Sequence, residues 1–177
     1  MENLLVVAAG KTVAQIKDAD FDAEGNIIKT LSVDNAQLWS PESPYLYKLV
    51  TRLYRKRKLV DQTQQKVGIR TVRVAQHDGF QLNGVSRKIK GVCLHHDLGP
   101  IGAAVNKSAL IRQIRTMKEM GCDAIRTAHN MPSTWQMEVC DSMGMMVMAE
   151  SFDMWIYPKC KNGYALNFKE WADKDIE

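Results

Sequence analysis

Alternating apolar and polar positions dominate the first 78 residues of the chain. The alternation is clearest over residues 12–17, 45–54 and 65–74. A period of two places every second side chain on one face, so each stretch is predicted to be a strand with one buried face. Turn-forming residues separate the strands at residues 24–26 and 41–44. We therefore expect an antiparallel β domain over residues 1–78, shorter than a complete sandwich of roughly 100 residues.

From residue 79 the pattern changes to short apolar runs that alternate with helical periods. The apolar runs, which predict buried strands, cover residues 89–94, 124–127 and 145–149. A first helix is predicted between an N-cap at Asn106 or Ser108 and a stop at Gly121, and a second between Ser133 and Gly144. Strands joined by single helices of this length run parallel. Residues 79–177 therefore predict an α/β unit.

Polar side chains follow each of the three predicted parallel strands. They are His95, His96 and Asp97 after the first strand, Arg126 and His129 at the end of the second, and Glu150 and Asp153 after the third. Ligands of parallel α/β sheets bind at the carboxyl ends of the strands. Because three strands deliver polar groups to one edge, this edge is the predicted binding site.

Arg126 and Glu150 are predicted to form an ion pair. Arg126 lies in an otherwise apolar strand, where an unpaired guanidinium is costly, so it needs a carboxylate or a ligand. Glu150 ends the neighbouring strand, and burial raises a carboxyl pKa unless a positive group is near. The sequence does not decide whether Arg126 stabilises this edge of the sheet through an ion pair or contacts a ligand directly.

His95 and His96 allow a metal site, a binding pocket or plain structural hydrogen bonding. Adjacent residues on an extended chain face opposite ways, which disfavours a metal held by both histidines. His129 is a candidate for holding a polar ligand. Trp155, which follows the rim glutamate closely, is a candidate ligand platform.

Composition excludes several classes of protein. The 177 residues are 45% hydrophobic and 25% charged, which is typical of a globular chain. The net charge of +4 is small, and the basic run at residues 55–58 has only Tyr54 as an aromatic neighbour, so it is expected to be a solvated hairpin turn rather than a nucleic-acid site. The apolar run at residues 4–9 is too short to span a membrane.

The cysteines and the first residues add two further expectations. The four cysteines are spaced irregularly, which favours buried free thiols over a zinc site or a disulfide framework. No basic segment and no cleavage site mark a secretory leader, so localisation stays open between the bacterial cytoplasm and periplasm.

Several segments together resemble glycoside hydrolase family 2, the β-galactosidase and β-glucuronidase family. In chain order these segments are LWSPESPYLY at 38–47, GIRT at 68–71, FQLNG at 80–84, KGVCLHHD at 90–97, MGCDAIRTAHN at 120–130 and MAESFDMW at 148–155. The resemblance covers most of the chain from about residue 30. The galactosidase-like members fit best because of Leu94 to Asp97 and the stretch at residues 102–104.

The resemblance implies a partial immunoglobulin-like β-sandwich over residues 1–78. Residues 79–177 would then be the first three βα units of a (β/α)₈ TIM barrel, which takes roughly 250 residues when complete. By the resemblance, the family hydrolyses β-linked glycosides with retention. The partner of the chain would be a β-galactoside or a related carbohydrate, with no nucleic acid and no membrane. An incomplete barrel is also expected to self-associate through its open sheet edges.

Retaining hydrolysis needs two carboxyl groups about 5 to 5.5 Å apart. By the resemblance, one is a glutamate in an Asn-Glu pair after the fourth strand and the other lies near the seventh, whereas the chain contains no Asn-Glu pair. We therefore expect no catalytic residue in this chain and no hydrolysis by it alone. The substrate-binding residues implied by the resemblance and by the rim are His95, His96, Arg126, His129, Asn130, Glu150, Asp153 and Trp155.

The resemblance also implies a magnesium ion at Glu150 in some relatives. A histidine two residues later completes that site in those relatives, and Phe152 stands there in this chain. The sequence therefore does not assign a cofactor to this chain, and Phe152 puts the magnesium ion in doubt. Two other hypotheses remain: a non-catalytic carbohydrate-binding or interaction module, and a metal-dependent hydrolase that uses His95, His96, His129 and Glu150.

Overall fold

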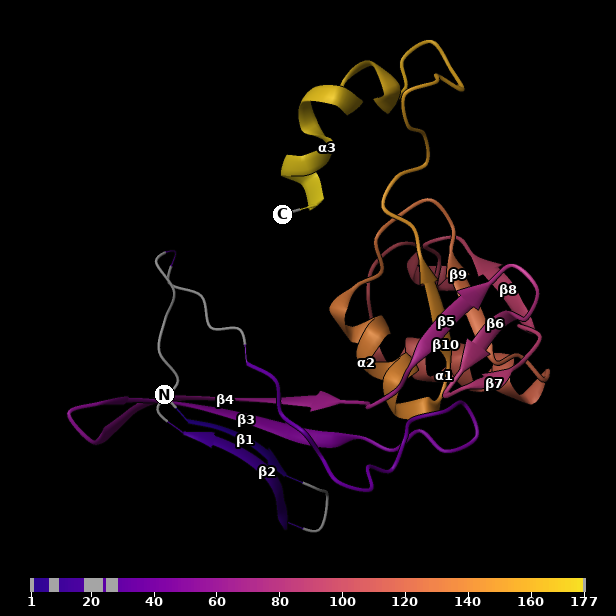
Figure 1. Cartoon of the computed structure of the whole chain (residues 1–177). Helices are drawn as coiled ribbons and strands as arrows, with labels where there is room; N and C mark the ends of the chain where they lie inside the picture. The colour runs from indigo at the N-terminus through magenta and orange to yellow at the C-terminus, as the bar shows by residue number, and fades with distance from the viewer. Residues whose placement is uncertain (1, 7–9, 18–23, 25–28, 177) are drawn as a thin grey trace. The chain divides into compact units, whose positions relative to one another are not determined.

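The computed structural model describes residues 2–6, 10–17, 24 and 29–176 (Figure 1). The chain divides into two compact units, Met1–Arg87 and Lys88–Glu177. The first unit is built from β-sheets, and the second combines parallel strands with helices. This mixed β and α/β organisation confirms the predicted fold class.

A four-stranded antiparallel sheet forms most of the first unit. Its strands are β1 (Glu2–Val6), β2 (Thr12–Lys17), β3 (Tyr47–Arg55) and β4 (Lys58–Val67), in the order β2-β1-β3-β4. Trp39, Tyr47 and Val50 are buried in this unit. The sequence predicts β2 and β3 but not β1, part of which falls in the apolar run at residues 4–9.

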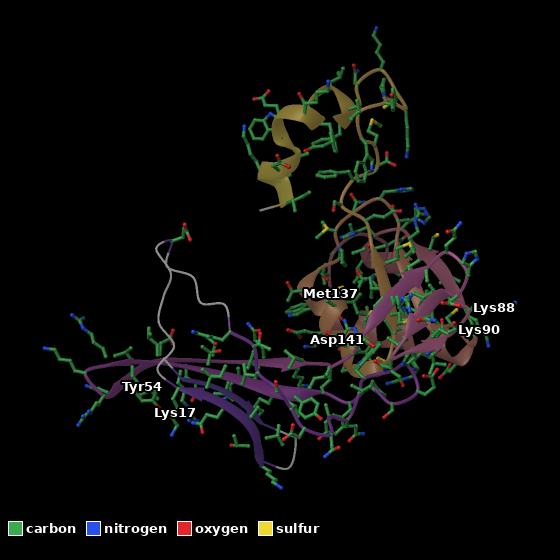
Figure 2. The ribbon with its side chains drawn as sticks, viewed as in Figure 1. Lys17, Tyr54, Lys88, Lys90, Met137 and Asp141 are labelled. Atoms are coloured by element: carbon green, nitrogen blue, oxygen red, sulfur yellow. The ribbon has the colours of Figure 1, made fainter. Side chains whose placement is uncertain are left out.

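The basic run at residues 55–58 forms the hairpin turn that the sequence predicts. Lys56 and Arg57 connect β3 to β4, and both have positive φ angles, of 48° and 65°. A two-residue turn with this backbone matches the twist of the paired strands. The labelled Tyr54 lies near the end of this hairpin in Figure 2. The exposed turn keeps the four basic side chains in water.

The predicted strand at residues 65–74 is wrong as a single element. β4 ends at Val67, and β5 (Val72–Ala75) begins a second sheet with β6 (Gly79–Leu82) and β7 (Val85–Ser86). The chain leaves the first sheet because the backbone N–H of Trp39 donates to the carbonyl of Ile69, at 2.8 Å. Gly68 fits there since a Cβ on it would come 3.0 Å from the Trp39 side chain.

The two predicted turns have different outcomes. Residues 41–44 form a bend, closed by two backbone hydrogen bonds between Ser40 and Ser43 at 3.0 and 3.1 Å. Of the turn predicted at residues 24–26, only Glu24 is described, and residues 25 and 26 lie outside the described part of the chain.

Three parallel strands form the sheet of the second unit. They are β8 (Gly91–Leu94), β9 (Ala124–Thr127) and β10 (Met146–Ala149), in the order β10-β9-β8. Helix α1 (Lys107–Glu119) joins β8 to β9, and α2 (Thr134–Met143) joins β9 to β10. The parallel strands and the two connecting helices confirm the predicted βα units.

Local capping explains where the two helices begin and end. The Asn106 side-chain oxygen accepts a hydrogen bond from the Ala109 N–H at 3.0 Å, and the Ser133 hydroxyl accepts one from Gln136 at 3.2 Å. These side chains satisfy backbone donors that the first turn leaves free. Gly144 follows α2 with a φ of 72°, a left-handed conformation that ends the helix.

The alternation along the strands separates a core face from an open face. Val92, Ile125 and Val147 are register partners, and all three belong to the core that α1 and α2 cover. The next register row, Cys93, Arg126 and Met148, therefore points to the other face of the sheet. The buried residues of this core are Leu110, Ile114, Ile125, Val139, Cys140 and Met145.

Residues after Glu150 contain structure that the sequence did not predict. A short 3₁₀ helix, η2 (Tyr164–Leu166), precedes helix α3 (Phe168–Ile176). Before Glu150, a further 3₁₀ helix that the sequence does not predict, η1 (Gly99–Ile101), follows β8. The ring of Phe152 stacks on that of Tyr164 at 5.1 Å and meets that of Phe168 edge to face at 5.3 Å. Aromatic packing thus links the segment after β10 to α3.

The four cysteines are all free, but their burial differs from the prediction. Cys140 is buried and Cys122 is half-buried, whereas Cys93 and Cys160 are exposed. The expectation of four buried thiols is therefore wrong for two of them. Within the described residues, no helix has the length and apolar character needed to cross a membrane.

Replacing Ile114 by alanine should destabilise the second unit by about 2 to 5 kcal/mol, because Ile114 is 0% exposed and its loss leaves a cavity. Ile176, which is 56% exposed, provides the matched control, and its replacement by alanine should cost less than about 0.5 kcal/mol. Urea denaturation followed by circular dichroism measures both changes. Equal effects of the two substitutions would contradict the assigned core.

Candidate functional site

The ion pair between Arg126 and Glu150 lies at the carboxyl ends of two neighbouring strands. Arg126 belongs to β9, and Glu150 directly follows β10. The Arg126 Nε donates to Glu150 Oε1, which confirms the predicted pair. A second nitrogen of the same guanidinium, Nη1, donates to the Sγ of Cys93 at 3.3 Å. Arg126 therefore connects all three strands of the sheet.

The second oxygen of Glu150 holds the loop after β9. Glu150 Oε2 accepts the backbone N–H of His129 at 2.7 Å, and the Glu150 backbone N–H donates to the Thr127 hydroxyl at 3.2 Å. His129 has a φ of 80°, in the left-handed region that residues other than glycine rarely adopt. The hydrogen bond from its N–H to a carboxylate stabilises this conformation.

The imidazole of His129 lies between two carboxylates and a second histidine. Its Nδ1 is 3.5 Å from Glu150 Oε2 and 3.4 Å from Asp153 Oδ1. Its ring meets that of His95 edge to face, with the centroids 5.3 Å apart. Lys159 in turn donates from Nζ to the Asp153 carbonyl at 2.5 Å and to Asp153 Oδ1 at 2.9 Å.

These contacts keep both carboxylates ionised. The His129 backbone N–H, followed by the Arg126 guanidinium, lowers the pKa of Glu150 below its usual value. The hydrogen bond from Lys159 lowers the pKa of Asp153. Hydrogen bonds to Cys93 and Glu150 raise the pKa of Arg126 above its already high value. At neutral pH Glu150 and Asp153 are therefore both negatively charged, and the cations beside them hold their carboxylates in place.

The structure brings together five of the residues that the sequence singled out: His95, Arg126, His129, Glu150 and Asp153. We call these five the rim cluster.

Three further residues matter here that sequence reasoning missed: Cys93, Thr127 and Lys159. Cys93 and Thr127 were detectable in principle, because the strand register pairs Cys93 with Arg126 and places Thr127 one residue after it. Lys159 had no such signal, since it reaches Asp153 through an irregular loop.

His96 and Asn130 lie in a different place from the rim cluster. Both line a pocket bordered by the segment after β8, by α1 and by the beginning of α2, together with Leu98, Gln113 and Gln136. His95 and His96 thus contact different surroundings, as alternation along an extended chain requires. Trp155 stacks on Phe168 at 5.6 Å within the aromatic group around Phe152, and it is 63% exposed.

The residues present do not fit a magnesium ion at Glu150. Both carboxylate oxygens of Glu150 already accept hydrogen bonds, from Arg126 and from His129. Phe152, at the position where some relatives carry a histidine, offers no lone pair and packs against Tyr164. Within the described part of the chain, no group of three His, Cys, Asp or Glu side chains is arranged to hold a metal. The guanidinium of Arg126 supplies the positive charge at Glu150 instead.

A β domain followed by parallel βα units, with polar groups at the strand ends, is the arrangement expected where a (β/α)₈ barrel begins after a β domain. Comparison with known proteins agrees with this class. The profile of glycosyl hydrolases family 2 matches residues 2–70, and the profile of the TIM barrel domain of the same family matches residues 72–171. This chain belongs to glycosyl hydrolases family 2.

Individual relatives are similar along nearly the whole chain. Beta-galactosidase BoGH2A of Bacteroides ovatus is 44% identical over 172 residues, which make up 96% of this chain and 20% of that protein. A putative beta-glucuronidase of Formosa agariphila is 37% identical over 98% of this chain and 16% of its own length. A solved family 2 member from Bacteroides cellulosilyticus superimposes with a TM-score of 0.90 at 38% identity, covering 99% of this chain and 23% of that one. The chain therefore spans about a fifth of the length of these relatives.

Replacing Arg126 by glutamine should raise the pKa of Glu150 toward its ordinary value, because a cation that favours the ionised form is lost. In the wild-type chain the contribution of Glu150 to stability is present above the ordinary carboxyl pKa and is lost as pH falls through the lowered one. The variant should lose this contribution at higher pH. Carbon-detected NMR titration of the Glu150 side chain measures the midpoint.

A matched control removes a different paired cation. Lys107 donates to Glu138 at 2.7 Å on the helices, away from the rim cluster. Replacing Lys107 by glutamine should leave the Glu150 midpoint where it is in the wild-type chain. An unchanged midpoint in the Arg126 variant would show that Arg126 does not control the ionisation of Glu150.

Proposed function

We propose that this chain is part of a retaining β-glycosidase with β-galactosidase-like specificity and that it supplies one side of the sugar-binding rim. The observation that carries the proposal is the rim cluster, in which ionised carboxylates and imidazoles from three parallel strand ends converge. Charged acceptors and imidazole nitrogens suit the hydroxyl groups of a sugar. The 44% identity to a beta-galactosidase supports the choice of substrate.

The contacts of each residue suggest the part that it would play in sugar binding. His95 and His129 would contact sugar hydroxyls, while Arg126 and Glu150 hold the loop that carries His129. Asp153 would contribute a further acceptor. His96 and Asn130 would act from the neighbouring pocket, and Trp155 would form an apolar wall for a sugar ring, since aromatic faces pack well against C–H surfaces.

We further propose that the 177-residue chain alone does not hydrolyse glycosides. Retention requires an acid/base and a nucleophile about 5 to 5.5 Å apart. Glu150 and Asp153, the carboxylates of the rim cluster, each accept a hydrogen bond from a cationic side chain, and the sequence has no Asn-Glu pair. The boundary between a sandwich part and a barrel part after residue 78 stays a prediction.

Self-association of the chain is a second part of this proposal. In the described structure β8 and β10 are the outer strands of a three-stranded sheet, whose open face carries Met148 at 60% exposure. The outer strand of a sheet presents unpaired backbone N–H and C=O groups, which favour pairing with a strand of another chain.

A second copy of the chain would cover this surface, and analytical ultracentrifugation should show a dimer or a larger species at micromolar concentration. A strictly monomeric chain would contradict this part of the proposal.

The wild-type chain should bind methyl β-galactoside weakly and should leave nitrophenyl β-galactoside uncleaved. Sugar addition should shift the NMR signals of His95 and His129. Replacing His129 by glutamine should weaken binding by about tenfold, which corresponds to about 1.4 kcal/mol. The same replacement at His77, an exposed residue in the turn between β5 and β6, is the matched control and should not change the affinity.

Three outcomes would oppose the proposal in different ways. Cleavage of the nitrophenyl glycoside by the pure chain would overturn the claim that it lacks a catalytic pair. An equal loss of binding in the His129 and His77 variants would show that the sugar does not bind specifically at the rim cluster. Binding to the chain combined with no turnover in any longer product of the same gene would favour a non-catalytic carbohydrate-binding module.

A further inference from the structure

Among the described residues, the polar atoms near the His129 Nδ1 atom are two carboxylate oxygens. Asp153 Oδ1 lies 3.4 Å from it and Glu150 Oε2 lies 3.5 Å from it. A neutral imidazole has one nitrogen that donates and one that accepts, and the partner of one nitrogen decides the state of the other. A carboxylate beside Nδ1 favours the tautomer that carries its proton there.

The two carboxylate oxygens that face Nδ1 each accept one hydrogen bond already, so the carboxylates differ in their remaining contacts. Glu150 Oε2 already accepts the backbone N–H of His129 at 2.7 Å, and Oε1 accepts from Arg126. Asp153 is bound on its own loop by a single residue, Lys159, at both its carbonyl and its Oδ1. Asp153 is also the nearer of the two to Nδ1. It is therefore the acceptor that we expect for the Nδ1 proton.

Lys159 fixes where Asp153 lies. Its ammonium group donates to the Asp153 carbonyl at 2.5 Å and to the carboxylate at 2.9 Å, which closes the loop between Asp153 and Lys159. The bond to Oδ1 restrains the Asp153 side chain, and the bond to the carbonyl restrains its backbone. The ring of His95, 5.3 Å from that of His129, limits rotation of the imidazole from another side.

We propose that Asp153, held by Lys159, is a positioning residue that keeps the His129 proton on Nδ1 and leaves Nε2 as the atom that meets a ligand. The ligand itself, a sugar hydroxyl that donates to Nε2, rests on the function proposed above. The tautomer does not rest on it, because the contacts that fix it lie within this chain.

Nitrogen-15 NMR of the full chain, correlated to the imidazole carbon-bound protons, reads the tautomer directly. In its neutral form His129 should show a protonated-type Nδ1 and an unprotonated-type Nε2. The His129→Gln variant identifies the signal among the four histidines of the chain. A wild-type His129 with its proton on Nε2 would overturn the proposal, whatever the chain binds.

Three variants test the role of Asp153 and its anchor. Asp153→Asn should shift the tautomer ratio toward Nε2–H by about tenfold, or about 1.4 kcal/mol. Lys159→Met should shift it in the same direction by less, because the carboxylate remains but is no longer held. Asp153→Glu, which restores a carboxylate, should recover most of the wild-type ratio.

Asp173→Asn on α3 is the matched control, since it removes an equal charge from an exposed site and should leave the ratio unchanged. Equal ratios in the wild-type chain and in Asp153→Asn would overturn the positioning role. So would a shift of the same size in Asp173→Asn. A confirmed tautomer in a chain that does not bind galactosides would leave this inference standing and would count against the proposed function alone.

Discussion

The carboxylate of Glu150 is the group on which the arrangement of the site depends. One of its oxygens accepts from Arg126 in β9, and the other accepts from the backbone of His129, which begins the loop leading to α2. Arg126 continues the connection to Cys93 in β8. One carboxylate thereby links the ends of three strands, and it does so with charge-assisted hydrogen bonds, which are stronger than neutral ones.

The hydrogen bonds of Glu150 also limit what can bind at this edge of the sheet. Because Arg126 and His129 occupy both oxygens, Glu150 is not free to hold a magnesium ion, and it acts as an organiser of the loop. In the proposed function the imidazoles meet the ligand, and Asp153 offers the carboxylate oxygen that Lys159 does not bind. The proposed function uses this surface to bind hydroxyl groups, and it assigns to this chain no member of the carboxyl pair that retaining hydrolysis requires.

The sequence predicts the second unit well because its signals there are local. Asn106 and Ser133 as N-caps, Gly144 as a stop and three short apolar runs define the βα units, and an isolated arginine in an apolar strand predicts its own partner. Prediction fails where the cause is a distant contact. The strand expected at residues 65–74 is divided because Ile69 pairs with Trp39, and α3 follows a segment ordered by aromatic packing. The grouping of His129 with Asp153 likewise depends on a left-handed residue and an irregular loop, which no periodic pattern reveals.

Hydrogen exchange at the backbone amide of His129 tests the central role of Glu150 most directly. This amide should exchange slowly in the wild-type chain and at the rate of an open loop after Glu150→Ala, while the Ala109 amide, which donates to the Asn106 cap, keeps its rate. Such a result would show that the carboxylate holds the loop after β9. A His129 amide that exchanges equally fast in both proteins would contradict the account, because the rim would then be organised by something other than Glu150.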